Sequence, residues 1–188
     1  MGGSRQMRAL YHDSMAIVRA ICKPDLFVTV TCNPRWPEIT ANLFHGQTAQ
    51  DRPDIVARVF KIKLHLILDD LLKNGYLGKA IAHMYVVEFQ KRGLPHAHIL
   101  IILAADDKPR TPADIDRIVC AELPDPDLFP QLYDTVTSCM LHGPCGRRNT
   151  NAPCMKDGKC SKNYLKAFAD ETQILVDQYA VYRRRDDG

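Results

Sequence analysis

Two histidines separated by one residue form the first pattern in the sequence with a chemical consequence. His96 and His98 lie in the segment Pro95–Leu103, whose other side chains are all apolar. Side chains alternate between the two faces of a β-strand, so both imidazoles project from the same face. Two imidazoles side by side can share one divalent cation. The pattern therefore predicts a metal site on a strand, and two half-buried histidines with satisfied hydrogen bonds are the alternative.

A third ligand for this cation must come from a neighbouring strand. Residues 81–90 predict a strand that folds back through a turn at residues 91–94, and this hairpin brings Glu88 almost opposite His96. Two imidazoles and one carboxylate suit Mn²⁺ or Mg²⁺ with open positions for phosphate oxygens and water. Gln90, on the same strand face as Glu88, is the alternative third ligand.

A second set of metal ligands lies in residues 142–163, which are rich in Gly, Pro, Asn and Cys and have no apolar period. The candidate ligands follow the spacing H-x2-C-x8-C-x5-C and are His142, Cys145, Cys154 and Cys160. Zn²⁺ takes four such N and S ligands in a tetrahedron, and bound metal would supply the folding energy that this loop lacks. Cys139 is an alternative to His142, and unligated thiols are the alternative to a metal site.

Other elements must position these two groups. Leu26 to Cys32 alternates between apolar and other side chains and predicts a strand, while apolar residues at helical spacing after Pro53 predict a core helix that ends at Asn74-Gly75. The sequence further predicts helices at 5–22, 38–44, 111–122 and 131–141, and a final strand at 172–182.

Composition limits the class of protein. Of the 188 residues, 46% are hydrophobic and 25% are charged, which is typical of a soluble globular protein and excludes disorder, collagen and coiled coil as descriptions of the whole chain. The longest uncharged apolar run, Ile99 to Ala105, is too short to span a bilayer, so we expect no membrane partner. The first residues have no apolar segment typical of a secretory signal, so disulfides are not expected among the seven cysteines.

The positive charge is concentrated near the end of the chain. The net charge is +3, and residues 141–188 carry 9 Lys and Arg against 6 Asp and Glu, while residues 1–140 carry 16 of each sign. This excess is compatible with a polyanionic partner, and a solvated basic surface is the alternative.

Several segments, taken together, resemble the replication-initiator domain of Helitron transposases, which is an HUH endonuclease. The first motif of that domain, its HUH motif, its two Cys/His segments and its VYRRRDDG segment correspond to Phe27–Ile39, Glu88–His98, His142–Cys145, Pro153–Lys162 and Val181–Gly188. The resemblance begins at about residue 10 and covers nearly the whole chain after it.

This resemblance implies an α+β fold with a central antiparallel sheet flanked by helices, the histidine strand at its centre, and a small C-terminal zinc-binding loop module. We expect residues 1–4 to be a cloning remnant, 5–139 the HUH endonuclease-like core, 140–165 the zinc-binding module and 166–188 a return strand to the core. The family's tyrosine helix is expected after this last segment, outside the chain.

The resemblance also implies a function, namely a metal-dependent single-stranded DNA endonuclease and strand-transfer domain of a rolling-circle transposase. His96, His98 and Glu88 would be catalytic through a metal that polarises the scissile phosphate for attack by a tyrosine. Tyr179 and Tyr182 have two residues between them, whereas the family's helical tyrosine pair has three. We therefore expect neither to be the nucleophile. A helicase domain in the same full-length polypeptide and a nuclear location are further implications.

DNA contacts are expected on the strand face that carries the histidines, and around it. The candidate residues are Thr29, Thr31, Arg35, Trp36, Lys91 and Arg92. Trp36 could stack on a base or, equally, anchor the core between its two flanking prolines. Two other functions stay open: a non-catalytic zinc-dependent nucleic-acid-binding module, and a metal-dependent hydrolase unrelated to DNA.

Overall fold

The computed structural model describes residues 4–89, 93–175 and 180–186. The chain divides into two compact units, Met1–Lys108 and Pro109–Gly188. From the sequence, we expected the boundary between the core and the zinc module between residues 139 and 140. That boundary between functional parts stays a prediction. Among the described residues, no helix is both long enough and apolar enough to cross a membrane.

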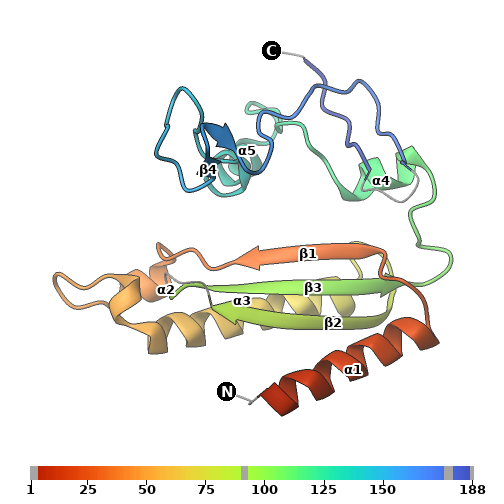
Figure 1. The fold of residues 1–188 in the computed structure, drawn as a ribbon, viewed down its shortest axis with the longest axis horizontal. Coiled ribbons are helices and arrows are strands. Elements are labelled where there is room, and N and C mark those ends of the chain that lie inside the picture. The colour runs from red at the N-terminus through yellow and green to blue at the C-terminus, as the bar shows by residue number, and fades with distance from the viewer. Residues whose placement is uncertain (1–3, 90–92, 176–179, 187–188) are drawn as a thin grey trace. The chain divides into compact units, whose positions relative to one another are not determined.

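The first unit is built on a three-stranded antiparallel sheet, which confirms the predicted α+β class with a central antiparallel sheet. Its strands are β1 (Leu26–Thr31), β2 (Ala80–Phe89) and β3 (Pro95–Leu103), in the order β1-β3-β2. The histidine strand β3 is therefore in the centre, as Figure 1 shows.

One face of this sheet is packed against α3 (Pro53–Leu72), which runs behind the strands in Figure 1. The helix buries residues at helical spacing, namely Val56, Phe60, Leu64, Leu68 and Leu71. Strand β3 contributes Ala97, Ile99, Ile101 and Leu103, each no more than 1% exposed. Full burial of one such aliphatic side chain contributes about 1.5–3 kcal/mol, so this face of β3 is fixed toward the helix. The histidines must then project from the opposite face.

Three shorter or peripheral elements complete the first unit. Helix α1 (Ser4–Ala20) agrees with the predicted helix at 5–22, whereas α2 (Pro37–Thr40) is shorter than the predicted 38–44. A 3-10 turn, η1 (Ala49–Asp51), precedes α3.

At the far end of β3, the Asp25 carboxylate accepts a hydrogen bond from the Leu103 amide at 2.8 Å and pairs with the Lys108 ammonium at 2.6 Å, which ties the start of β1 to the end of β3.

The second unit has short helices and one small hairpin. Helix α4 (Pro112–Ile118) begins with a capping box in which Thr111 and Asp114 bond each other's backbone amides. Helix α5 (Pro130–Thr135) continues into a π-helical turn, η2 (Val136–Met140), and together they account for the helix predicted at 131–141. Strands β4 (Met155–Lys156) and β5 (Lys159–Cys160) form the hairpin.

The end of the chain differs from the single strand predicted at residues 172–182. The segment pairs with itself through the isolated bridges Ala169↔Arg184 and Gln173↔Val181, and residues 176–179 are outside the described part. The described bridges do not include the expected return to the sheet of the first unit. Alternation of apolar residues predicted a strand here, but polar contacts within the second unit hold the segment instead.

These contacts join the segment to residues in and just after α4. The buried Thr172 hydroxyl donates to Asp116 Oδ1 at 2.5 Å and accepts from the Arg183 amide at 2.8 Å. The Arg185 guanidinium binds both carboxylate oxygens of Glu122, at 2.7 and 2.8 Å. These hydrogen bonds hold the pKa of Glu122 down to about 2.

Candidate metal centres

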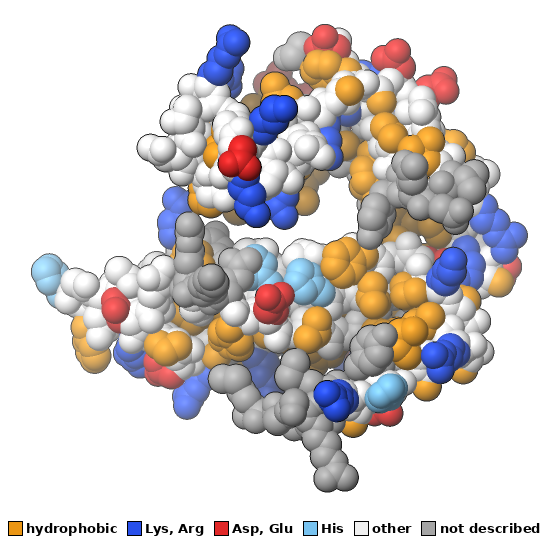
Figure 2. Space-filling view, in the orientation of Figure 1, with side chains coloured by type: hydrophobic (Ala, Val, Ile, Leu, Met, Phe, Trp, Pro, Cys, Tyr) orange, Lys and Arg blue, Asp and Glu red, His pale blue; other side chains and the backbone are white. Residues whose placement is uncertain are grey.

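The open face of the three-stranded sheet carries both histidines at its centre. The backbone register places Thr31 of β1 and Glu88 of β2 on either side of His96, and Thr29 beside His98. Both histidines are half-buried, while Thr29 and Thr31 are exposed. Figure 2 shows histidine and acidic side chains next to each other on this face. Both imidazoles therefore lie on the same face of the sheet, as the alternation along β3 predicted.

Each imidazole is held by a threonine from β1. Nδ1 of His96 lies 3.0 Å from the Thr31 hydroxyl oxygen, and Nδ1 of His98 lies 3.2 Å from the Thr29 hydroxyl oxygen. With Nδ1 engaged, Nε2 is the nitrogen that each ring has available for a cation. Metal-binding histidines in proteins are held in this manner, through a hydrogen bond at the second ring nitrogen. We expected both threonines to meet DNA, and that stays a prediction; in the structure their hydroxyls hydrogen-bond the two rings.

Glu88 supplies an oxygen donor to the same face. Its carboxylate lies 3.6 Å from Nε2 of His98, and its side chain is 67% exposed. Desolvation and the neighbouring His98 lower the pKa of His96, and Glu88 acts in the opposite direction. Neutral imidazole is the form that binds a metal ion. Two nitrogen donors and one carboxylate are ligand types that suit a divalent cation with open positions.

Phe27 is a feature of this face that the sequence analysis missed. Its ring stacks on His98, with ring centroids 5.5 Å apart and an interplanar angle of 11°. Alternation along β1 places Phe27 on the same strand face as Thr29, but its stacking on His98 depends also on the pairing of β1 with β3.

The other predicted DNA contacts lie outside this face or outside the described residues. Trp36 packs against the core of the first unit, and the Lys63 ammonium lies 5.1 Å from its ring centroid. This packing favours the core-anchor alternative for Trp36. Arg35 is exposed, and its amide donates to the Asn33 side chain at 2.9 Å. The further predicted or alternative residues that fall outside the described part are Gln90, Lys91, Arg92 and Tyr179.

The second unit brings the four predicted zinc ligands together. Over residues 4–89, 93–175 and 180–186, one group of three or more His, Cys, Asp or Glu side chains has its ligand atoms already gathered as a metal ion would need, and its members are His142, Cys145, Cys154 and Cys160. Their ligand atoms all lie within 4.8 Å of one another. Among the same described residues, the set His96, His98 and Glu88 is not gathered in this way. One nitrogen and three sulfur donors fit tetrahedral Zn²⁺. Cys139 is exposed in η2 and is not part of the group, so the structure favours His142.

Local backbone conformation explains how a loop without an apolar core brings these four residues together. Asp157 and Gly158 connect β4 to β5 and have φ values of 50° and 74°, the pair of positive angles typical of a tight two-residue hairpin turn. The turn pairs Met155 with Cys160, and the Ser161 amide donates to the Cys154 carbonyl at 2.8 Å. Both cysteines at the base of the hairpin are therefore held side by side.

Hydrogen bonds and stacking organise the ligands further. The Tyr164 and Lys162 amides donate to the Cys160 sulfur and hold its pKa down to about 6, whereas desolvation raises the pKa of the Cys145 thiol to about 11. The Tyr164 ring stacks on His142 with centroids 4.0 Å apart and an interplanar angle of 4°. The sequence analysis did not foresee this stacking, because no spacing rule links the two residues.

Comparison with known protein families gives a match that lies within the first unit. The family model described as the Helitron helicase-like domain at the N-terminus matches residues 1–101, which is more than half of the 188-residue chain. The matched part includes Glu88, His96 and His98 and ends before the four clustered ligands of the second unit. No curated protein matches the chain.

Proposed function

The chain belongs to the Helitron helicase-like N-terminal domain family, and on this premise we propose that it is the metal-dependent, single-strand-specific HUH endonuclease and strand-transfer domain of a rolling-circle transposase. One observation carries the proposal: two imidazoles at the centre of an open sheet face, each oriented by a threonine hydroxyl, with a carboxylate 3.6 Å from one of them. A helicase domain in the full-length polypeptide and a nuclear location belong to the same proposal.

In this proposal His96, His98 and Glu88 hold Mn²⁺ or Mg²⁺. Bound there, the cation supplies Lewis-acid polarisation of a phosphate oxygen. The chain's own residues orient the site, because Thr29 and Thr31 hold the rings through Nδ1. The substrate is single-stranded DNA, which lies over the open face of the sheet.

The reaction that the family resemblance implies is attack of a tyrosine oxygen on phosphorus. The new P–O bond gives a 5′-phosphotyrosine, the bond from phosphorus to the 3′ oxygen breaks, and that oxygen takes up a proton to leave a free 3′-OH. We place the attacking tyrosine outside residues 1–188, where the resemblance puts the family's tyrosine pair. Tyr182, in the self-paired terminal segment, is not assigned this role.

A structural Zn²⁺ held by the four clustered ligands is the second part of the proposal. The same cluster also favours a second candidate function, a non-catalytic zinc-dependent nucleic-acid-binding module. Its four donor atoms are already gathered within 4.8 Å, a compactness that supports metal binding in the second unit independently of the histidine face.

Metal analysis and DNA binding on the 188-residue chain separate the candidates. One tightly bound Zn²⁺ together with an exchangeable Mn²⁺ site that is lost in His96→Ala and His98→Ala supports the endonuclease. His65→Ala, an exposed histidine of α3, is the matched control and should retain Mn²⁺ binding. Zinc without an Mn²⁺ site supports the binding module. Failure to bind a single-stranded oligonucleotide contradicts both and leaves a hydrolase unrelated to DNA.

A further inference from the structure

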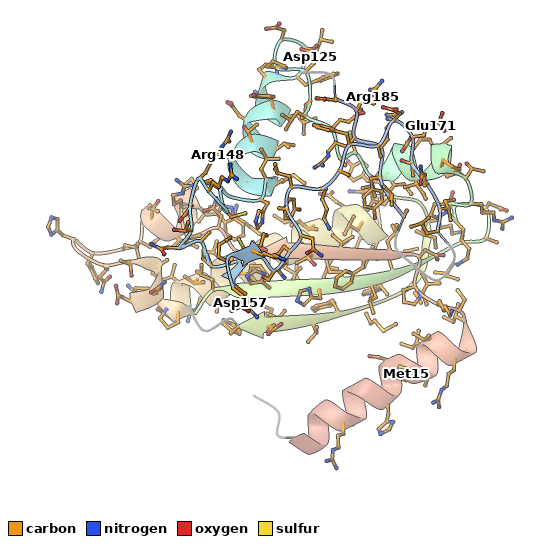
Figure 3. The ribbon with its side chains drawn as sticks, turned by 45° about the horizontal axis from the view of Figure 1, so that its top comes forward. Met15, Asp125, Arg148, Asp157, Glu171 and Arg185 are labelled. Atoms are coloured by element: carbon orange, nitrogen blue, oxygen red, sulfur yellow. The ribbon has the colours of Figure 1, made fainter. Side chains whose placement is uncertain are left out.

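An apolar pocket of about 410 Å³ lies between α1 and the open face of the sheet. The lining residues on which the argument depends are Met15, Val18, Phe27, Met84, His98 and Leu100. Met15, labelled in Figure 3, belongs to α1. Pockets for small organic ligands measure roughly 300–1,000 Å³, so the volume suits a planar ring system.

The pocket borders directly on the proposed metal site, because His98 is part of both. Nε2 of His98 faces Glu88 at 3.6 Å, while the flat side of the same ring stacks on Phe27 at 5.5 Å between centroids. A ligand that places a phosphate at the two histidines would therefore bring its neighbouring group to the mouth of the pocket.

The Phe27 ring is accessible to a ligand. It is 58% exposed, whereas the other β1 side chains either pack against the core or hydrogen-bond the histidines. Its place among the residues that line the apolar pocket puts the ring within reach of a ligand bound there. In single-stranded nucleic acid, bases stack on such rings whatever their identity.

We propose that this pocket receives one nucleobase of the bound single strand, the base next to the phosphate at His96 and His98, and that Phe27 is its stacking platform. This inference rests on the proposed function, since the phosphate at the histidines is what aligns the base. The lining is mostly apolar, so the pocket recognises the face of the base and not its hydrogen-bonding edge. We therefore expect the pocket to bind any nucleobase and to show no preference for one DNA sequence.

An abasic scan of a single-stranded oligonucleotide tests the pocket. A single abasic site is moved along the strand, and the affinity of the 188-residue chain is measured for each position in Mn²⁺. We expect one position at which loss of the base weakens binding about 5- to 150-fold, the range for one stacked base. Phe27→Ala should abolish this position dependence, and Phe27→Tyr should restore it.

Phe44→Ala is the matched control, because Phe44 is another exposed phenylalanine, 72% exposed, in a loop away from the pocket lining. It should leave the scan unchanged. A fluorescent base analogue at the sensitive position gives a second readout: quenching on binding to the wild-type chain and not to Phe27→Ala.

The outcomes separate the two proposals. Binding of the strand with a flat abasic profile, or a profile unchanged in Phe27→Ala, overturns the base pocket and leaves the proposed function in place. Absence of any binding to the intact strand overturns the proposed function, and the pocket with it.

Discussion

The carboxylate of Glu88 lies 3.6 Å from Nε2 of His98, although the backbone register places Glu88 opposite His96. The long side chain thus crosses diagonally to the next histidine on the same face. Diagonal neighbours on adjacent strands are within reach of long side chains. The consequence is that Glu88 is closest to the histidine that also stacks on Phe27.

Glu88→Gln should weaken Mn²⁺ binding at the histidine face by at least the roughly 10- to 100-fold seen when a group that only supports metal ligands is lost, because Glu88 is proposed as a ligand itself. The amide keeps the shape of the side chain and removes its charge. Glu171→Gln, an exposed carboxylate of the second unit, should have no effect. Calorimetric titration with Mn²⁺ gives the comparison, and an unchanged affinity in Glu88→Gln would remove Glu88 from the site and return Gln90 as the candidate.

Thr29→Val and Thr31→Val should each weaken the same Mn²⁺ affinity, again about 10- to 100-fold. Valine preserves the branched shape on the strand and removes the hydroxyl that bonds Nδ1 of the histidine. Serine at either position should restore most of the affinity. The nitrogen chemical shifts of both rings report the cause directly, and rings whose shifts are the same in the valine variants would show that the threonines do not orient them.

Purified chain should contain one Zn²⁺, with sulfur ligands at about 2.3 Å and the imidazole at about 2.0–2.1 Å. Serine at Cys145, Cys154 or Cys160 should lower the zinc content, whereas Cys139→Ser should not. X-ray absorption measures both distances. Chelation should increase hydrogen exchange in residues 140–165 and leave the sheet of the first unit protected; equal exchange with and without chelator would contradict the site.

Low pH should destabilise the second unit because it protonates the Glu122 carboxylate. Its pKa in the folded chain is about 2, below the usual 4.5, mainly because of the hydrogen bonds from Arg185. A depressed carboxyl pKa contributes stability above pH 4.5, and this contribution is lost as the pH falls toward 2. Glu122→Gln should therefore be less stable than wild type near neutral pH and should show a weaker pH dependence in that window.

The measurement is urea denaturation across this pH range in the presence of chelator, so that metal loss does not contribute. Glu171→Gln serves as the control within the same unit. A wild-type urea midpoint that does not change between pH 5 and pH 2, values chosen to bracket the pKa shift, would rule out the role of Glu122.

The 188-residue chain should bind single-stranded DNA in Mn²⁺ without forming a covalent adduct. The reason is that the attacking tyrosine is proposed to lie outside these residues, so the phosphate has no positioned hydroxyl to attack it. A labelled strand run on a denaturing gel after incubation checks this. An adduct that disappears in Tyr182→Phe or Tyr179→Phe would place the nucleophile within the chain instead.

Local sequence patterns were sufficient to predict the sheet and the cluster of one histidine and three cysteines. Ala97, Ile99, Ile101 and Leu103 lie two positions apart on β3, so their burial against α3 leaves the imidazoles the opposite face. The turn at Asp157-Gly158 likewise fixed the pairing of the cysteines around it. The hairpin depends on residues that are close in sequence, and the orientation of β3 follows from its own alternating pattern. Both can therefore be predicted from a short stretch of sequence.

Non-local polar contacts explain what the sequence did not predict. The segment from Thr172 to Arg185 reads as a strand, but its geometry depends on Asp116 and Glu122, which lie 56 and 63 positions away from their partners. The same holds for Phe27 and His98, whose stacking requires the β1–β3 register to be known first. No local spacing encodes either relationship.

The two candidate centres differ in how far apart in the chain their parts are. Thr29 and His98 are 69 positions apart, whereas His142 and Cys160 are 18 apart. Opening of β1 away from β3 would separate both threonines from both histidines at once. The thiols and the imidazole of the second unit would instead stay tethered on a short loop, at a high effective concentration for one another. Under partial denaturation the chain should therefore retain zinc after it has lost the oriented histidine face.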